Sequence, residues 1–516
     1  MQREPDDQTF WDDIEGYCGQ LSYRPGETAQ IHVSTKADTY DVVVERWGAS
    51  RVEVRRREGV SGQFHQPPDD ADSMGCRWPV GVEVPVGSDW ASGFYLVTLR
   101  AHGAPAGRNV GHAGFVVRAE TGRRAETLLI LATNTWNAYN TWGGRSLYTG
   151  GNQVSFRRPF GRGMLCRPQV DRTDRKARPV RFREQPDAGG HIFQEYRTSN
   201  GYPSAIGSAG WFTHERRFVE WAESEGFEFD MAVSSDLETV ADLLDGYRLV
   251  LSVGHDEYWS AKGRDAIDAH IAAGGNFASF SGNTMFWQVR LTDQADHMIC
   301  HKYTAPDTDP VVADGDPTAM SGMWCDPLVG RPEWTTLGAG SAYGLYHRFG
   351  DATPRGVGGF EIVDPDHWML TGTGLRYGDV LGRDDGVVGY ETLGCPLQFD
   401  ETNRLVARVD SGWPAEIEIV GFTLSSNLAV GEYPASVAAL SDQGDLEFIC
   451  RRLEGEASEE AMAKWRRGNA VMLACRPAGL SGGQVATVGS TDWVFGLAED
   501  AIVARVTANI VDYLAT

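Results

Sequence analysis

Residues 248–287 read RLVLSVGHDEYWSAKGRDAIDAHIAAGGNFASFSGNTMFW and contain two apolar runs separated by a stretch with helical spacing. The apolar runs at residues 248–253 and 276–281 predict buried strands, and residues 260–273 predict a helix that a Gly-Gly pair ends. Strand, helix and strand in this order indicate a parallel sheet joined by right-handed crossovers. Ligands usually bind at the carboxyl ends of such strands, so we expect a site directly after each run.

The same alternation extends in both directions from this segment. Residues 127–132 form a continuous apolar run that suits a strand buried on both faces. The other predicted elements are a helix at 217–226, a strand at 227–232, a short Ser/Asp-capped helix at 235–244, a strand at 416–422, and helices at 456–467 and 500–514. The pattern therefore predicts an α/β domain with a parallel sheet over residues 119–516.

The amino-terminal residues follow a different pattern, in which short β-branched and aromatic runs are bounded by turns. The predicted strands are 30–34, 41–47, 82–86 and 93–101. The economical interpretation is an Ig-like β-sandwich domain over residues 1–118. Such sandwiches usually act as rigid spacers or interaction modules, so we predict no chemistry in this part of the chain.

Two insertions interrupt the predicted α/β domain. Residues 162–190 are rich in Arg, Pro and Asp with little apolar periodicity, which predicts a long surface segment and a candidate wall or lid of a site. Residues from about 291 to 415 contain many Gly and Trp residues and short strand-like pieces, which predicts a β-rich insert. Four of its aromatic residues are expected to be core residues: Trp334, Tyr343, Tyr346 and Trp368.

Composition and charge exclude several classes of partner. The formal charge is -24, from 71 acidic and 47 basic residues, so the surface repels phosphate backbones and anionic lipid, although the charge can also simply keep the protein soluble. Residues 1–17 lack the basic start and apolar core of a secretory signal, and the chain has no apolar run of membrane-spanning length. The eight cysteines are scattered without a CxxC pair, which indicates reduced thiols. We expect a cytoplasmic protein that binds neither nucleic acid nor membrane.

Four polar stretches carry the candidate chemistry. They are TNTWNAYNTWGGRSLY at 133–148, VGHDEYW at 253–259, SGNT at 281–284 and GYE at 389–391. Three of the four follow predicted strands, and this convergence indicates a functional site. Polar residues at strand ends can instead cap the next helix, as Asp256 or Ser260 could do here.

Three segments in combination resemble the large, catalytic subunit of the N,N-dimethylformamidase family. They are residues 133–148, the GHDEYW segment and the GGN-x4-SGNT segment at 274–284. The resemblance covers roughly residues 22–516. It implies hydrolysis of dimethylformamide to formate and dimethylamine at a mononuclear ferric ion, Fe3+, held by two tyrosines and one glutamate.

The resemblance also assigns the metal ligands. By residue-to-residue correspondence they are Tyr139, Tyr148 and Glu257. Phenolate and carboxylate oxygens are hard anionic ligands, and three of them supply three negative charges, which match Fe3+ better than zinc. The ion would polarise an amide carbonyl and lower the pKa of bound water.

Three further residues correspond to a histidine beside the glutamate ligand and to polar residues that line the family's pocket. Glu391 is the predicted general base, and Asn283 is the predicted donor to the developing oxyanion. His255 is predicted to orient Glu257 or to transfer a proton, although it could be an ordinary buried histidine. The implied partners are a small amide substrate, further copies of the chain in a homo-oligomer, and a small subunit as a further candidate.

Other functions compete with this hypothesis. A parallel α/β sheet with a polar turn resembles the class I glutamine amidotransferase fold, and we predict that fold for residues 119–516. Those enzymes place a nucleophilic cysteine at the strand-to-helix turn, whereas no cysteine lies near residues 255–257. The chain also lacks a Gly-x-Ser-x-Gly elbow, a P-loop and a dinucleotide fingerprint. Two alternatives stay open: a non-catalytic protein that binds a small polar or sugar-like ligand through its tryptophans, and a hydrolase of a larger amide or an amidine.

Overall fold

The computed structural model describes most of the chain, namely residues 12–120, 122–167, 201–203, 205–292, 294–408, 412–414, 416–434, 443–477, 479 and 481–516. Two compact units are present. The first unit contains Met1–Thr173, Gln194–Leu243 and Leu291–Ile299, and the second contains Asp174–Phe193, Leu244–Arg290 and Cys300–Thr516. Residue 118, near which the sequence predicts a domain boundary, lies within the first unit. Most of the predicted insertion at 162–190 lies outside the described residues.

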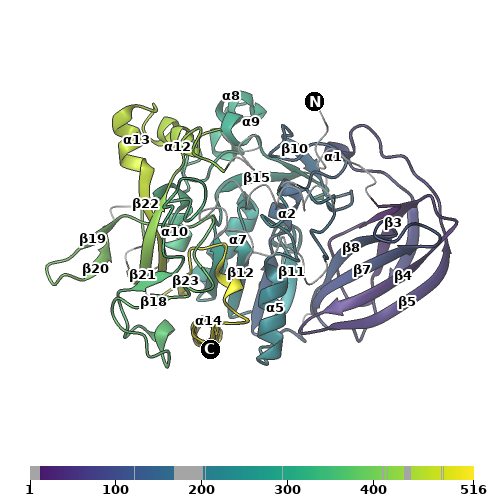
Figure 1. Cartoon of the computed structure of the whole chain (residues 1–516), viewed down its shortest axis with the longest axis horizontal. Helices are drawn as coiled ribbons and strands as arrows, with labels where there is room; N and C mark the ends of the chain where they lie inside the picture. The colour runs from purple at the N-terminus through teal and green to yellow at the C-terminus, as the bar shows by residue number, and fades with distance from the viewer. Residues whose placement is uncertain are drawn as a thin grey trace. The chain divides into compact units, whose positions relative to one another are not determined.

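The first unit contains a β-sandwich, drawn in purple and blue in Figure 1. Its sheets have the strand orders β1-β3-β6 and β2-β8-β7-β4-β5. The strands are β1 (Ile14–Cys18), β2 (Ser22–Tyr23), β3 (Thr28–Thr35), β4 (Thr39–Trp47), β5 (Arg51–Ser61), β6 (Val80–Pro85), β7 (Gly93–Ala101) and β8 (Val110–Val117). Buried and partly buried residues alternate along β4, and side chains from both sheets form one apolar core that includes Ile31, Val44 and Val97.

The strands predicted from the amino-terminal pattern are confirmed. The prediction at 93–101 coincides with β7, and the other three lie within or overlap β3, β4 and β6. Strand β5 was not predicted: nine of its eleven residues are exposed and six are charged, so its apolar alternation is limited to Val52 and Val54. The sequence therefore identified four strands of the sandwich and missed the other four, β1, β2, β5 and β8. Of these, β1, β2 and β8 contribute Ile14, Tyr23 and Phe115 to the same core.

The first unit also contains α/β elements. Strand β9 (Thr127–Leu131) pairs in parallel with β11 (Asp230–Val233), as the apolar runs predicted. The other elements are α1 (Ala71–Met74), α2 (Thr133–Tyr139), β10 (Gln153–Ser155), α5 (Glu215–Ser224), α6 (Asp236–Thr239) and β16 (His297–Ile299). The helix predicted at 235–244 is shorter than expected, and Ser235 makes no capping hydrogen bond.

The second unit is built on a mixed sheet with the strand order β12-β14-β23-β22-β21-β17-β18. The strands are β12 (Leu249–His255), β14 (Asn276–Gly282), β23 (Val485–Thr487), β22 (Arg467–Cys475), β21 (Ile417–Ser426), β17 (Phe360–Ile362) and β18 (Val380–Leu381). β12, β14 and β23 are parallel, as predicted, whereas the pairs from β23 to β18 are antiparallel. The fold class is therefore mixed α/β, and among these strands the predicted parallel arrangement holds for β12, β14 and β23 only.

The helices of the second unit follow local sequence signals. The longer ones are α7 (Ala261–Ala272), α12 (Asp445–Leu453), α13 (Glu459–Arg466) and α14 (Ala501–Ala515). Ser260 caps α7 by accepting the Gly263 backbone N–H at 3.1 Å, and Asp500 caps α14 through the N–H of Ile502 at 2.8 Å. The predicted helices at 260–273 and 500–514 are confirmed. Among the described residues, no helix is long and apolar enough to cross a membrane.

Residues 291–415 differ from the expected β-rich insert, because short helical turns are as frequent there as strands. The helical turns are η3 (Lys302–Thr304), α8 (Ala305–Thr308), α9 (Pro310–Ala313), η4 (Pro317–Ala319), α10 (Trp334–Leu337), η5 (Ser341–Tyr343) and η6 (Trp368–Leu370), and the hairpin is β19 (Leu397–Phe399) with β20 (Leu405–Ala407). Its aromatic residues pack on one another, since Trp334 stacks on Trp413 and Trp368 stacks on Tyr513. Of the four aromatic residues predicted to be core residues, only Tyr346 is buried, whereas Trp334, Tyr343 and Trp368 are partly exposed.

Candidate functional site

Two parallel strands of the second unit end side by side at the candidate site. In the register of β12 and β14, His255 pairs with Gly282, so the residues that follow each strand begin at the same edge of the sheet. All seven residues of β12 are buried. The turn after β12 therefore places His255 and Glu257 beside Asn283, as the sequence predicted for strand ends.

A second pair of parallel strands fixes the backbone of Glu257. Strand β13 (Tyr258–Ser260) pairs with β15 (Trp287–Thr292), and Tyr258 lies opposite Trp287. The Trp287 backbone N–H donates to the Glu257 carbonyl at 2.9 Å, and its indole N–H donates to Glu257 Oε1 at 2.7 Å. One residue thus holds both the main chain and the side chain of Glu257.

Glu391 reaches the site from a segment far along the chain. Its carbonyl accepts the Thr491 backbone N–H at 3.1 Å. Gly282 makes this approach possible, because a Cβ there would lie 2.3 Å from the Glu391 carbonyl oxygen and 2.4 Å from the Thr491 nitrogen. A glycine at the end of β14 is therefore required by the close packing of two backbones.

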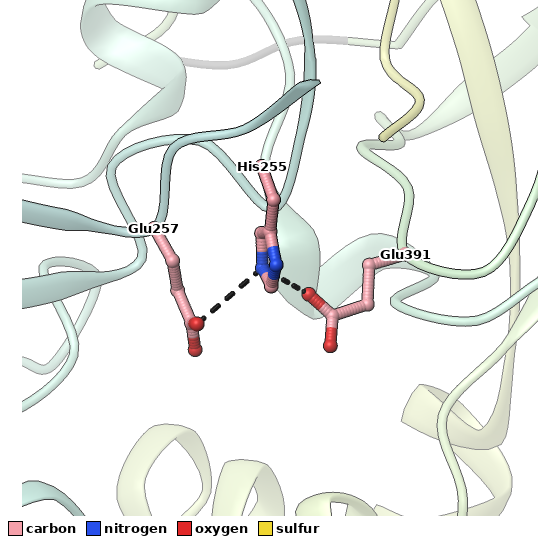
Figure 2. A group of neighbouring side chains, drawn as sticks. All are labelled: His255, Glu257 and Glu391. Carbon is pink, nitrogen blue, oxygen red and sulfur yellow. Dashed lines mark ion pairs between the residues drawn. The ribbon is translucent and has the colours of Figure 1, made fainter. Parts of the chain in front are cut away.

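The three candidate groups converge on one point, as Figure 2 shows, with the two carboxylates on either side of the His255 ring. His255 Nε2 forms ion pairs with Glu391 Oε2 at 2.6 Å and with Glu257 Oε2 at 3.3 Å. One ligand atom from each residue lies within 4.8 Å of the other two. The Tyr390 hydroxyl lies 3.1 Å from His255 Nδ1, on the other side of the ring.

The cluster is buried, which makes its charges costly unless they are compensated. His255, Glu257 and Glu391 are 2%, 3% and 5% exposed. Asn283 donates through Nδ2 to Glu391 Oε2 at 2.9 Å. Burial also raises the pKa of the neighbouring Asp256 to about 7, even though that carboxyl accepts a hydrogen bond from Ser252 Oγ.

Lys302 is a buried cation near these carboxylates that the sequence analysis did not identify. Its ammonium lies 5.3 to 5.8 Å from the ring centroids of Tyr258, Trp287 and Tyr303. Burial lowers the pKa of Lys302 to about 8, against the attraction of the Glu257 carboxylate. A single lysine after a Cys-His pair carries no recognisable signal, so only the fold reveals its position.

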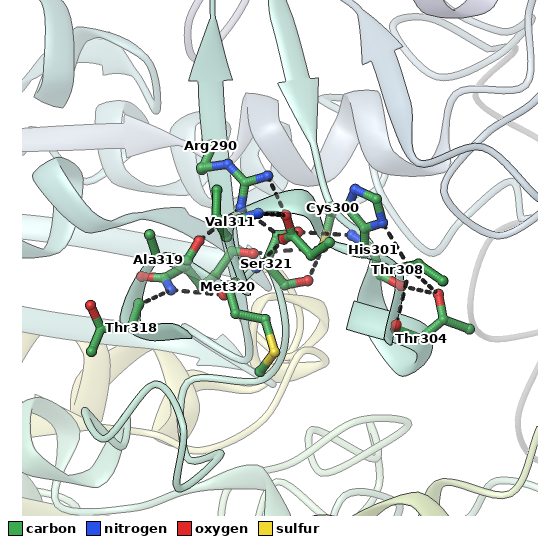
Figure 3. A network of polar contacts seen from close by, with 12 residues as sticks. Arg290, Cys300, His301, Thr304, Thr308, Val311, Thr318, Ala319, Met320 and Ser321 are labelled. Carbon is green, nitrogen blue, oxygen red and sulfur yellow. Dashed lines mark hydrogen bonds and ion pairs between the residues drawn. The ribbon is translucent and has the colours of Figure 1, made fainter. Parts of the chain in front are cut away.

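Figure 3 shows a polar network that includes Arg290 and Ser321, and Ser321 also binds the backbone of Lys302. Arg290 binds the buried Asp309 carboxylate through two N–H groups at 2.7 and 2.8 Å, and Ser321 Oγ donates to the same carboxylate at 2.6 Å. Although burial opposes it, these hydrogen bonds hold the pKa of Asp309 well below its usual value. The Ser321 carbonyl accepts the Lys302 backbone N–H at 3.0 Å, which holds Lys302 at its left-handed φ of 52°.

The two tyrosines predicted as metal ligands belong to the first unit. Tyr139 is the last residue of α2, and its ring stacks on that of Tyr148 with centroids 4.2 Å apart. The Leu147 N–H donates to the Ala138 carbonyl at 3.1 Å, which brings the Tyr148 segment to the end of the helix. The structure therefore brings Tyr139 and Tyr148 together in one unit, and His255, Glu257, Asn283 and Glu391 together in the other.

The residues of the second unit fit a bound metal ion. Two buried carboxylates and one imidazole offer two oxygen atoms and one nitrogen atom at mutual distances that a single ion can bridge. A cation at this point would also compensate the two carboxylates. This set shares Glu257 with the ligands implied by the family resemblance.

Comparison with known proteins extends over almost the whole chain. Residues 41–507 match the family described as N,N-dimethylformamidase beta subunit-like, C-terminal. The beta subunit of N,N-dimethylformamidase from Paracoccus aminophilus is 24% identical over 231 residues, which are 42% of this chain and 28% of the relative. The subunit of the same name from an Alcaligenes species is 35% identical over 74 residues, 14% of this chain and 10% of the relative.

These matches show the family and leave much of each relative uncovered. The matched regions span less than a third of the length of either relative. The polar stretches that predicted the resemblance all lie within residues 41–507. Because the family match covers well over half of its residues, this chain belongs to the N,N-dimethylformamidase beta subunit-like family.

Proposed function

We propose that this protein is a metal-dependent hydrolase that cleaves a small amide, similar to N,N-dimethylformamide, into a carboxylic acid and an amine. The main support for this proposal is that Glu391, His255 and Glu257 form one buried cluster. Asn283 donates a hydrogen bond to Glu391 in this cluster. Membership of the family supports the same reaction. General acid–base catalysis uses a positioned side chain that can accept and donate a proton. A buried carboxylate held by a hydrogen-bond donor is such a side chain.

Glu391 is the general base of the proposed reaction. Its Oε2 is occupied by Asn283 and His255, whereas the described residues provide no hydrogen-bond donor to its Oε1. Oε1 accepts a proton from water as the water oxygen bonds to the amide carbon. The carboxyl group then gives that proton to the amide nitrogen, the C–N bond breaks, and acid and amine leave.

Asn283 and His255 support this sequence. The amide of Asn283 has two N–H groups, of which one holds Glu391 Oε2 and the other serves the oxyanion on the substrate. His255 lies between the two carboxylates, where it orients both and can exchange a proton with Glu391. The buried surroundings exclude bulk water and strengthen these interactions.

The proposed metal is a mononuclear Fe3+ held by Tyr139, Tyr148 and Glu257, and this ligand set rests on the family resemblance. The stacked rings of the two tyrosines support it, since ligands of one ion must lie close together. When bound, the ion would polarise the amide carbonyl and increase the acidity of water. The alternative set is His255, Glu257 and Glu391, whose donor atoms also fit an ion.

Finer features of the fold and assembly belong to the same proposal. We propose an Ig-like topology for the sandwich and a glutamine-amidotransferase-like arrangement for the parallel strands. The relatives are named beta subunits, which supports an oligomer of this chain or assembly with a small subunit. That the beta subunit is the large, catalytic one is likewise part of the resemblance.

An amide assay with a matched pair of variants tests the proposal. The wild type is expected to release amine from formamide, N-methylformamide, N,N-dimethylformamide or a larger amide, and Glu391→Gln to lower kcat by about 100-fold or more. The control is Glu418→Gln, at a side chain that is 58% exposed, which should leave kcat unchanged. Wild-type activity that survives Glu391→Gln would contradict the assigned base, and no activity on any amide would contradict the function.

A further inference from the structure

Asn283 is held in an unusual conformation directly after β14. Its φ is 51°, in the left-handed region that asparagine tolerates better than most residues, and it is 1% exposed. Both ends of its side-chain amide are engaged: Nδ2 donates to Glu391 Oε2 at 2.9 Å, and Oδ1 accepts from Ser341 Oγ at 2.7 Å. Asn283 therefore bridges the proposed base and a serine from another element.

The two partners of the amide have different effects on it. A carboxylate oxygen can only accept, so Glu391 selects the orientation in which Nδ2 faces it. The Ser341 hydroxyl donates to Oδ1 and holds the amide in that orientation. Without this hydroxyl, Oδ1 would be a buried acceptor that has lost its partner, and the amide would be held only at its Nδ2 end.

The backbone of Ser341 is itself held by a hydrogen bond to another residue. It begins η5 and is fully buried, and its backbone N–H donates to Glu333 Oε1 at 3.0 Å. Gly340 permits this contact, because a Cβ there would lie 2.7 Å from the same carboxylate oxygen. The chain of contacts thus runs from Glu333 through Ser341 and Asn283 to Glu391, within the second unit.

We infer that Ser341 is a positioning residue for the hydrolytic reaction: its hydroxyl fixes the Asn283 amide, which in turn holds Glu391 Oε2 and leaves Oε1 for water. This inference rests on the proposed role of Glu391 as the base. Ser341 acts through Asn283 and does not touch the reacting atoms. Its removal should therefore affect the rate of the chemical step more than the binding of substrate.

Kinetics of a double-mutant cycle test the inference. Ser341→Ala should lower kcat about tenfold with KM nearly unchanged, and in an Asn283→Ala background it should cause no further loss. The control Thr507→Val also removes a buried hydroxyl, whose partners are Trp493 and Val503, and should leave kcat unchanged. An unchanged kcat in Ser341→Ala, or the same tenfold loss in both backgrounds or in the control, would overturn the inference.

A crystal structure of the Ser341→Ala variant provides a readout that does not depend on activity. The distance from Asn283 Nδ2 to Glu391 Oε2, 2.9 Å here, should exceed 3.5 Å as the amide turns away. If Ser341→Ala does not fold, Ser341→Cys keeps nearly the same volume and weakens the donor. A contact that stays at hydrogen-bond length in the variant would refute the role of Ser341. If the wild type hydrolyses no amide, the proposed function fails, and this structure alone decides whether Ser341 holds the amide.

Discussion

Glu257 and Glu391 lie on either side of one imidazole ring, and each receives a hydrogen bond from a different side chain. Trp287 donates to Glu257, and Asn283 donates to Glu391. A carboxylate with one oxygen fixed in this way presents its other oxygen in a defined direction. At the scale of single residues, the geometry of the site therefore depends on Trp287 and Asn283 as much as on the two carboxylates.

Trp287→Phe tests the donor to Glu257. It removes the indole N–H but keeps an aromatic ring against Tyr303 and Phe448, so we expect metal affinity to fall by about 10- to 100-fold. Competition with a chelator measures this affinity. Trp493→Phe is the matched control, because that buried indole donates to Thr507 and should not affect the metal. Equal affinities in the wild type and Trp287→Phe would show that the indole N–H does not support the ligand.

Glu333→Gln tests the electrostatics behind Ser341. Burial raises the pKa of Glu333 from 4.5 to about 7, so the folded state favours the protonated form. Its contribution to stability is fully present below pH 4.5 and is lost as the pH rises through about 7. The glutamine can still accept the Ser341 N–H and does not titrate. Relative to Glu333→Gln, the wild type should therefore lose up to about 3 kcal/mol between pH 5 and pH 8.

Urea unfolding of both proteins at the two pH values measures this difference. Glu361→Gln, at an exposed side chain of β17, serves as the control and should show no such trend. A difference between wild type and Glu333→Gln that stays constant from pH 5 to pH 8 would show that Glu333 does not titrate in this range.

Part of the site was predictable residue by residue, and part was not. His255, Glu257 and Asn283 follow apolar strands, so the strand pattern alone indicated that they share one edge. Ser341 and Lys302 follow no predicted strand and belong to no motif, and each lies in a short helical turn. The assignment of Tyr139 and Tyr148 as ligands stays a prediction, since it came from the resemblance.

At the scale of elements, the end of β14 determines how closely the segment around Glu391 can approach. Gly282→Ala would place a Cβ within 2.4 Å of two backbone atoms, which cannot give way as a flexible side chain can. We expect at least a tenfold loss of kcat and about 1 to 3 kcal/mol of stability, from amide assays and urea unfolding. Gly322→Ala is the control, since the nearest neighbour of its Cβ would be the flexible tip of Met320 at 3.0 Å, and no backbone atom is among its three nearest neighbours. Full activity in Gly282→Ala would mean that Glu391 does not depend on this contact.

The elements themselves show why a pattern is predictive in one place and not in another. β12 and β14 are buried along most of their length, so an apolar run revealed them. The antiparallel strands β22 and β21 continue the same sheet, but their direction depends on pairings between residues far apart in sequence. Short elements such as η5 and η3 have three residues each and leave no periodic pattern to detect.

At the scale of the whole molecule, the family match runs through both compact units, from the sandwich to the last helix. The proposed function likewise draws on residues of both units, with the two tyrosines in the first unit and the cluster of His255, Glu257 and Glu391 in the second. The charge of -24 is consistent with a small uncharged substrate rather than with a polyanion. The central claim is therefore that the chain binds one hard metal ion through phenolate oxygens.

Metal content and visible absorption of the purified protein test this claim most directly, beside Tyr139→Phe and the control Tyr95→Phe, whose hydroxyl lies in the sandwich. The account predicts about one iron per chain and a phenolate-to-iron absorption band that weakens in Tyr139→Phe and persists in Tyr95→Phe. A folded, colourless wild type that stays free of iron after reconstitution would contradict it.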